Sequence, residues 1–328
     1  MLGAIYRGEE QGDIPTMPNG SRKIENIDSI LIAREGRLVF EEYFNYHSRT
    51  NAHDVASVSK SITSILIGLA IEQGHIVSIQ DKVLTFFPEY TPLKVEDPRK
   101  EDITIEDLLT MRSGLECDDW DPASRSYYLK NQPNRADEIE FILNIPMDIK
   151  PGVLFSYCTW GTVVLNALLF KTTGMELPVY ANKFLFQPLG TRSVFWGGPY
   201  RTWKNTDGIA LMTSRDMAKI GQLMLQNGKW DGEEIIPEAW IEQSTRQSEP
   251  LLFNETWGKG YGYLWWISDV PIAGRMIHSF AASGYGGQVI AVFPDLDMVI
   301  VLTGSNYEND TGQPFDIMER YILPAILP

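Results

Sequence analysis

Strand-like runs lie at both ends of the chain and enclose a middle that is patterned as helices and loops. Residues 29–34 and 37–44 flank Glu35-Gly36, whose turn chemistry predicts a β-hairpin. Later strand-like runs follow at 261–267 with 276–280, at 288–293 and at 298–303. Because short turns join consecutive strands, the pattern predicts an α+β fold with an antiparallel sheet of about five strands flanked by helices.

Capping residues and glycine stop signals predict where the main helices begin or end. The longest apolar stretch begins at Ser57 and ends at Gly74, a residue type that favours the position just after a helix. The other predicted helices begin at Thr104 and Thr213, each with an aspartate three residues on, or cover 161–172 and 314–326.

The length of 328 residues exceeds the usual size of a single core, so one large two-layer domain or two subdomains are expected, and we expect the latter. Residues 1–75 and 206–328 are expected to form a discontinuous α/β part, although residues 1–25 show no regular pattern. Residues 76–205 are expected to form a mainly helical part. We expect an active site in the cleft between the two parts, where pockets tend to occur.

The composition narrows the classes of partner. With 44% hydrophobic and 22% charged residues, the chain is typical of a globular protein. Its net charge of −15 would repel nucleic acids and anionic membrane surfaces, so neither partner is expected. A small-molecule substrate is compatible with this charge, and the oligomeric state stays open.

Cysteine and histidine usage gives no sign of a disulfide framework or a metal site. The two cysteines, Cys117 and Cys158, imply no disulfide framework, and the four histidines are scattered without metal-ligand spacing. The first residues lack the apolar core of a signal peptide, so a cytoplasmic location is expected. The alternative is a periplasmic or secreted protein whose signal has been trimmed.

The candidate chemistry begins with Ser57 and Lys60, three residues apart in the first turn of the longest apolar helix. Residues at this spacing share a helix face, and a neighbouring lysine that is shielded from water can take the proton of a serine hydroxyl. The helix N-terminus also favours developing negative charge on a reacting oxygen. The competing interpretation is a capped helix with a surface lysine, which the apolar stretch after Ser61 disfavours.

Two other segments offer the remaining parts of an acyl-transfer site. Tyr157 is a candidate proton carrier, with a core tyrosine as the alternative. Residues 282–288 are rich in glycine at the junction of two strand-like runs, which permits a close approach of backbone to ligand. The alternative for this segment is an ordinary glycine-rich hairpin turn.

Together these segments resemble the serine β-lactamase-like hydrolases, which include class C β-lactamases, DD-peptidases, bacterial esterases and nylon-oligomer hydrolases. The resemblance covers nearly the whole chain, and residues 103–115 are similar to the family segment I-T-I-x-D-L-L-x-x-x-S-G-L. Residues 208–218 and 261–266 also resemble family landmarks. By this resemblance Ser57 is the acylated nucleophile, Lys60 the lysine of S-x-x-K, and Tyr157 the tyrosine of Y-x-N. Whether Lys60 or Tyr157 acts as the general base stays open.

The same resemblance assigns substrate-binding positions and shows two departures. Ser283 and Gly284 match the last two positions of the K-T-G element, and Tyr285 would supply the second oxyanion N–H beside that of Ser57. Thr159 stands where Y-x-N has asparagine, and Ala282 stands where K-T-G has its lysine.

The resemblance implies a hydrolase that needs no cofactor and acts on small esters, with amides as a second substrate class. Two alternatives are a β-lactamase or DD-peptidase-like amidase, and a catalytically silent binding or sensor protein. A Ser-His-Asp α/β-hydrolase is disfavoured because G-x-S-x-G and the strand–helix alternation are missing. Five tryptophans are candidates for an apolar acyl pocket, or for core positions: Trp120, Trp160, Trp196, Trp265 and Trp266.

Overall fold

The computed structural model describes residues 26–90, 97–124, 138–191, 194–196, 210–250, 259–272, 274–307 and 313–327. The segment 1–25, for which no regular pattern is expected, lies outside these residues, as do residues 208 and 209 of one family landmark. The expected boundary between residues 205 and 206 lies outside them too, so the division into two parts stays a prediction.

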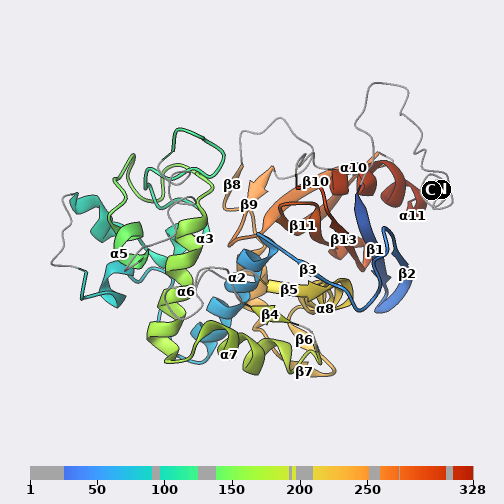
Figure 1. The fold of residues 1–328 in the computed structure, drawn as a ribbon, viewed down its shortest axis with the longest axis horizontal. Coiled ribbons are helices and arrows are strands. Elements are labelled where there is room, and N and C mark those ends of the chain that lie inside the picture. Colours follow the sequence, from blue (N-terminus) through green and yellow to red (C-terminus); the bar gives the residue numbers. More distant parts are fainter. Residues whose placement is uncertain are drawn as a thin grey trace.

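The main sheet has eight antiparallel strands in the order β2-β1-β13-β12-β11-β10-β9-β8 (Figure 1). Its strands are β1 (Ile27–Arg34), β2 (Arg37–Tyr43), β8 (Glu249–Pro250), β9 (Gly260–Tyr261), β10 (Trp266–Ile272), β11 (Arg275–Gly284), β12 (Gln288–Phe293) and β13 (Met298–Gly304). Strands β3 (Ala52–Asp54), β4 (Phe195–Trp196) and β5 (Ala210–Thr213) form a small sheet, and β6 (Lys229–Trp230) pairs with β7 (Glu233–Glu234).

The antiparallel sheet is therefore confirmed, with more strands than the expected five. One predicted strand was wrong in detail. The run 261–267 is divided between β9 and β10, because Leu264 between them has a φ of 61°, which no strand accommodates.

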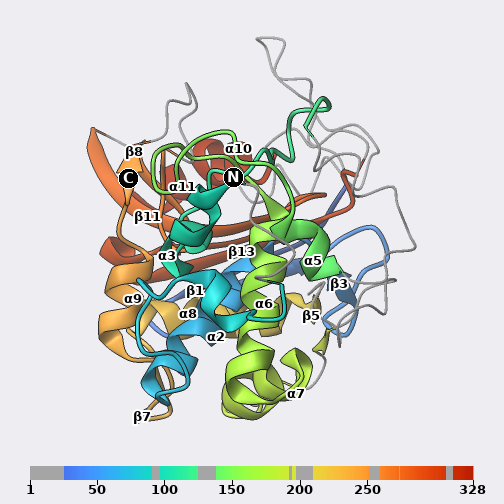
Figure 2. The same ribbon diagram turned by 90° about the vertical axis from the view of Figure 1, so that its left-hand side faces the viewer.

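Both faces of the sheet are apolar because helices cover both (Figure 2). Ile30 and Ile32 of β1 join one cluster with the C-terminal helices, whereas Leu31 points into the other cluster with α2 and α8. This is the two-residue period of a strand. Helix α8 lies so close to the sheet that a Cβ at Gly221 would be 2.5 Å from Val299 Cγ1.

The helix signals locate most helix ends correctly. Gly74 follows α2 with a φ of 74°, Gly174 caps α6 in the left-handed conformation, and Thr104 forms a complete capping box with Asp107. The α-helices are α2 (Val58–Glu72), α3 (Ile105–Leu109), α5 (Glu138–Leu143), α6 (Thr159–Thr173), α7 (Leu177–Ala181), α8 (Ser214–Leu225), α9 (Glu238–Ser244), α10 (Gln313–Ile317) and α11 (Leu323–Ile326). The 3₁₀-helices are η1 (Val83–Phe86), η3 (Pro98–Asp102) and η6 (Pro294–Leu296). The π-helical segments are η4 (Asn182–Phe186) and η7 (Met318–Ile322).

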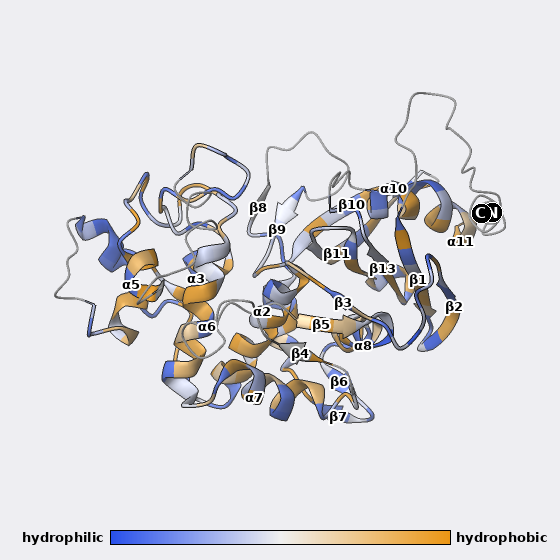
Figure 3. Ribbon diagram, in the orientation of Figure 1, coloured by the Kyte–Doolittle hydropathy of each residue, from blue (hydrophilic) through white to orange (hydrophobic). Residues whose placement is uncertain are grey.

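Helices α3, α5 and α6 gather on one side of the molecule, and α2 lies between them and the sheet (Figure 1). Hydrophobic stretches run along α6 and along β1, both of which face the interior (Figure 3). Helix α2 contacts both α6 and β11, so its N-terminus lies where the helical region and the sheet meet. Within the described ranges, no helix is long and apolar enough to cross a membrane.

Candidate active site

Ser57 and Lys60 meet at the N-terminus of α2, as their spacing predicts. Ser57 is the N-cap residue, and Lys60 Nζ donates a hydrogen bond to Ser57 Oγ at 2.8 Å. Lys60 is 7% exposed, so its amine is largely withdrawn from water. Because the contact spans one helical turn, α2 alone positions both groups.

The backbone before Ser57 is held in an unusual conformation. Ala56 has a φ of 46°, in the left-handed region, which costs a non-glycine residue about 1–2 kcal/mol. The Asp54 carboxylate accepts a hydrogen bond from the Ala56 N–H at 2.8 Å and supports this turn. Such strain is found where a functional side chain must be presented at a fixed angle. The sequence analysis did not single out Asp54, which holds the turn before Ser57.

The neighbouring serines of α2 have structural partners. Ser59 Oγ accepts from the Ala210 N–H at 3.0 Å, which joins α2 to β5. Ser61 Oγ donates to the Leu264 carbonyl at 2.6 Å. These hydroxyls are engaged in holding the helix, whereas the Ser57 hydroxyl contacts an amine.

The C-terminal end of β11 approaches the nucleophile candidate closely. A Cβ at Gly284 would lie 2.3 Å from Val55 O and 3.1 Å from Ser57 N, so only glycine fits this contact. The pairing of β10 with β11 ends at Trp266 and Ala281. The residues of β11 that follow Ala281 therefore extend past the end of β10. The structure thus places the predicted Ser283 and Gly284 beside the start of α2.

Two backbone N–H groups are available at this junction. Within the described ranges, the N–H groups of Ser57 and Tyr285 do not donate a hydrogen bond to a backbone oxygen. The Tyr285 side chain is half-exposed and its hydroxyl donates to the Tyr307 carbonyl, which anchors the turn after β11. Free N–H groups at a helix start and an adjacent turn are suited to holding an oxyanion.

Tyr157 lies beside Lys60, buried among aromatic rings. Lys60 Nζ is 5.2 Å from the centroid of the Tyr157 ring. Trp120 and Trp266 stack near this ring, with centroids at 5.0 Å and 5.8 Å and interplanar angles of 6° and 17°. Burial, and then the electrostatic effect of Tyr157, raise the pKa of the neighbouring Tyr261 well above its usual value.

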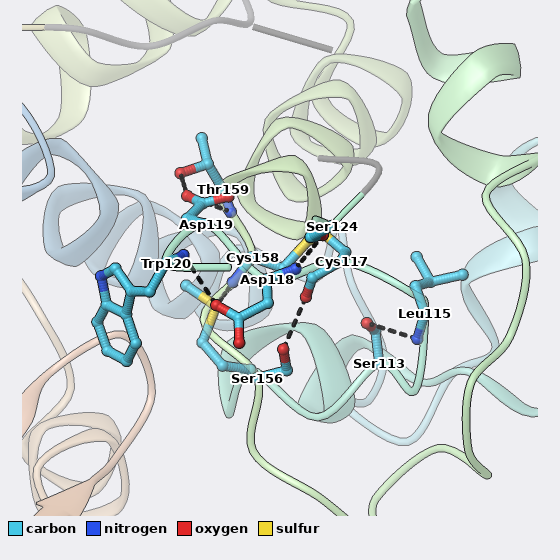
Figure 4. Close-up of a disulfide and its surroundings, with 11 residues drawn as sticks. Ser113, Leu115, Cys117, Asp118, Asp119, Trp120, Ser124, Ser156, Cys158 and Thr159 are labelled. Carbon is cyan, nitrogen blue, oxygen red and sulfur yellow. Dashed lines mark hydrogen bonds between the residues drawn. A yellow bond between two sulfur atoms is a disulfide. The ribbon is translucent and has the colours of Figure 1, made fainter. Parts of the chain in front are cut away.

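A disulfide between Cys117 and Cys158 ties the loop 117–120 to the segment that carries Tyr157 (Figure 4). The sequence analysis expects no disulfide framework, and the structure shows that the two cysteines nevertheless pair: they are 41 residues apart in sequence, and the fold brings their Cα atoms to 5.5 Å. Ser156 Oγ donates to the Cys117 carbonyl at 2.7 Å, and the Asp119 N–H donates to the Tyr157 carbonyl at 2.8 Å. Three bonds therefore fix the Tyr157 backbone to one loop.

Thr159, a predicted substrate-binding residue, is bonded to Asp119 of the same loop (Figure 4). The Thr159 N–H donates to Asp119 Oδ2 at 3.2 Å, and its hydroxyl donates to the same oxygen. The Asp119 carboxylate thus caps the N-terminus of α6, where negative charge is favourable. Sequence reasoning missed Asp119, and the available signal was that Cys158 directly follows Tyr157 while Cys117 lies two residues before Asp119.

The five tryptophans divide between the site and the core. Trp120 and Trp266 face Tyr157, and Trp120 is half-exposed. Trp265 is fully buried against Phe280, and Trp160 is buried in the same cluster. The Trp196 side chain lies outside the described residues, so only its backbone in β4 is placed.

Comparison with known proteins supports one family. A model of the Beta-lactamase family matches residues 25–319. The 6-aminohexanoate-dimer hydrolase of Paenarthrobacter ureafaciens is 24% identical over 314 residues, which cover 90% of this chain and 77% of that protein.

Solved structures show the same fold. An octameric penicillin-binding protein homologue from Pyrococcus abyssi superposes with a TM-score of 0.72 at 22% identity, covering 91% of this chain and 73% of the other. A hydrolase described as having promiscuous acyltransferase activity gives a TM-score of 0.69 at 18% identity, covering 91% and 92%. With a family match that spans most of its length and a fold that agrees, the chain belongs to the Beta-lactamase family of serine hydrolases.

Proposed function

We propose that this protein is a hydrolase that forms an acyl-enzyme on Ser57. The observation that carries the proposal is the 2.8 Å hydrogen bond between Lys60 Nζ and Ser57 Oγ at a buried helix N-terminus. A serine hydroxyl becomes a competent nucleophile when an adjacent group takes its proton. The family match supports the reaction class.

The geometry supports a division of roles. Ser57 Oγ attacks the carbonyl carbon while its proton passes to Lys60 Nζ, which must be an unprotonated amine for this step and is within hydrogen-bond distance. The carbonyl oxygen becomes an oxyanion and is held by the N–H groups of Ser57 and Tyr285. Tyr157, beside Lys60, carries a proton to the leaving oxygen or nitrogen. Water then attacks the acyl carbon and loses a proton along the same path in reverse. That proton returns to Ser57 Oγ as the acyl group leaves, which frees Ser57.

Small uncharged esters are the substrate class that we propose. Trp120 and Trp266 form an apolar wall beside Tyr157, which suits an uncharged acyl or alcohol group. Ala282 is fully buried and carries no charge with which to bind a substrate carboxylate. The Asp119 carboxylate at Thr159 adds a negative charge on that side, which disfavours anionic substrates.

Amide hydrolysis is the second candidate, favoured by the likeness to a 6-aminohexanoate-dimer hydrolase. Amides need a better-placed proton donor, because an amine leaves less readily than an alcohol. The hydroxyl of Thr159 donates its hydrogen bond to Asp119, so it is less available to bind a substrate amide.

Kinetics on three matched chromogenic substrates test the proposal. We expect kcat/KM to be highest for a short-chain p-nitrophenyl ester, lower for the p-nitroanilide with the same acyl group, and lowest for a chromogenic cephalosporin. Ser57→Ala should lose about 10³-fold or more on the best substrate. Faster cephalosporin turnover would assign β-lactamase activity instead, and no Ser57-dependent turnover of any substrate would favour a silent binding protein.

A further inference from the structure

Asp28, His47 and His53 come together outside the hydrolytic site. Asp28 lies on β1, His53 on β3, and His47 in the connection between β2 and β3. One side-chain ligand atom from each lies within 4.8 Å of the other two, and within the described ranges this is the one such group of three. His47 Nε2 is 3.6 Å from Asp28 Oδ1, and His53 Nδ1 is 3.8 Å from Asp28 Oδ2.

These separations are too long for hydrogen bonds and close to those of ligands that share an ion. A hydrogen bond between nitrogen and oxygen is typically about 2.7–3.2 Å long. Around tetrahedral zinc, with Zn–N and Zn–O distances near 2.1 Å, two ligand atoms lie roughly 3.4 Å apart. The observed separations of 3.6 Å and 3.8 Å, each to a different oxygen of Asp28, are close to this value. The three ligand atoms, which lie within 4.8 Å of one another, would have to draw together around an ion.

A hydrogen bond on the far side of His53 orients its ring. His53 Nε2 lies 3.3 Å from Thr303 Oγ1, which is also hydrogen-bonded to Ser29 Oγ. An ion bound at Nδ1 would require the His53 proton on Nε2, from which it can be donated to Thr303 Oγ1. Metal-binding histidines are typically held by such an outer hydrogen bond.

The surroundings of Asp28 favour a cation at the same place. Asp28 is 1% exposed, and its carboxylate accepts hydrogen bonds from Ser305 Oγ and, at 3.4 Å, from Asn45 Nδ2. Within the described ranges it forms no ion pair with a lysine or arginine, and a buried carboxylate is costly without a compensating charge. The rings of His47 and His53 are stacked with centroids at 4.6 Å, which two protonated rings would resist. His47 keeps part of its side chain exposed and so leaves a route for an ion from solvent.

We propose that Asp28, His47 and His53 bind one divalent cation of the Zn²⁺ class, with water completing the coordination. Two imidazoles and one carboxylate suit zinc, whereas Mg²⁺ and Ca²⁺ prefer all-oxygen sites. The ion would join β1, β3 and the connection between β2 and β3. Because β3 ends at Asp54, which supports the turn before Ser57, the site would stabilise the base of the nucleophile segment.

Zinc titration of the full chain, after a chelator has removed bound metal, tests this site. We expect calorimetry to show one Zn²⁺ per chain, and the melting temperature to rise with Zn²⁺ concentration but not with Mg²⁺. Co²⁺ bound in place of Zn²⁺ should give the visible absorption of a four-coordinate site. Absence of stoichiometric Zn²⁺ binding, or the spectrum of hydrated Co²⁺ alone, would overturn the proposal.

Two histidine variants locate the ion. His47→Gln changes the most exposed of the three ligands and should weaken Zn²⁺ binding by about tenfold or more. The control is His278→Gln, since His278 lies 3.0 Å from Asp269 in an exposed pair outside the cluster, and it should bind Zn²⁺ as the wild type does. Equal binding by both variants would refute the assignment to this cluster. If His47→Gln fails to fold, the proposal is tested by the Co²⁺ spectrum of the native chain: a four-coordinate spectrum supports it, and the spectrum of hydrated Co²⁺ overturns it.

Discussion

The Ser57 side and the Tyr157 side of the site are held by different kinds of structure. Ser57 and Lys60 sit within one turn of α2, so their contact is local in sequence. Tyr157 is fixed by a loop 40 residues earlier, through a disulfide, backbone bonds and stacked rings. The Ser57–Lys60 contact is kept as long as the helix is folded. The position of Tyr157 depends instead on long-range contacts, which mutations can remove one at a time.

The largest effect is expected when the proton path that joins the two sides is removed. Lys60→Ala and Tyr157→Phe should each lower kcat/KM by on the order of 10²–10⁴-fold, because each deletes a group that moves a proton. The double variant should be little worse than either single one, since groups on one path act as a unit.

Steady-state kinetics on the best ester measure both singles and the double. Lys171→Ala, at the end of α6 and paired with Glu89, is the matched control and should keep wild-type turnover. Losses that multiply in the double variant would mean that the two sides work independently.

The second prediction concerns the disulfide that holds the Tyr157 side of the site in place. Replacing Cys117 and Cys158 by alanine removes a cross-link with a sequence separation of 41, worth about 4 kcal/mol in the chain-entropy model. The loop then no longer fixes Tyr157, so kcat/KM should fall roughly 10- to 100-fold by loss of alignment. Urea unfolding and ester kinetics report the two quantities.

Wild-type kinetics in the double-cysteine variant would show that the aromatic stack alone holds Tyr157.

The smallest effect concerns an ion pair between β2 and α8, outside the candidate site. The Arg215 side chain donates to Glu41, and this lowers the pKa of the Glu41 carboxyl below its usual 4.5. A lowered folded pKa means that the stabilisation is present above the unfolded pKa and is lost as pH falls through the folded value. Glu41→Gln should cost about 0.2–1 kcal/mol near neutral pH.

Stability curves of Glu41→Gln and wild type should therefore converge in acid, while kcat/KM is unchanged. A stability difference that persists undiminished below the folded pKa would exclude the Arg215 interaction as its cause. A fall in kcat/KM would show that the sheet edge influences the site.

The features that could be predicted from sequence are the local ones. The spacing of Ser57 and Lys60, the glycine stop at Gly74 and the capping box at Thr104 each depend on a few adjacent residues. The strand runs were found because both faces of the sheet are covered and therefore apolar. The glycine at 284 was noticed, and the structure supplies its reason in the contact with Val55 and Ser57.

The features that escaped prediction are set by partners distant in sequence. The Cys117–Cys158 disulfide, the Asp119 cap on Thr159 and the cluster around Asp28 each join segments that no periodicity connects. The histidines look scattered in the sequence because His47 lies in a connection and His53 on a strand, and neither shares a helical turn with Asp28. Spacing rules apply within an element, whereas these contacts depend on how strands are ordered in the sheet.

Covalent labelling of Ser57 tests the central claim most directly. The intact chain is incubated with a fluorophosphonate probe, and mass spectrometry then measures the mass increase and locates the modified peptide. The account predicts one adduct per chain on Ser57, no adduct in Ser57→Ala, and wild-type labelling in Ser61→Ala, whose hydroxyl binds the Leu264 carbonyl. An adduct on another serine, or labelling that persists in Ser57→Ala, would contradict it.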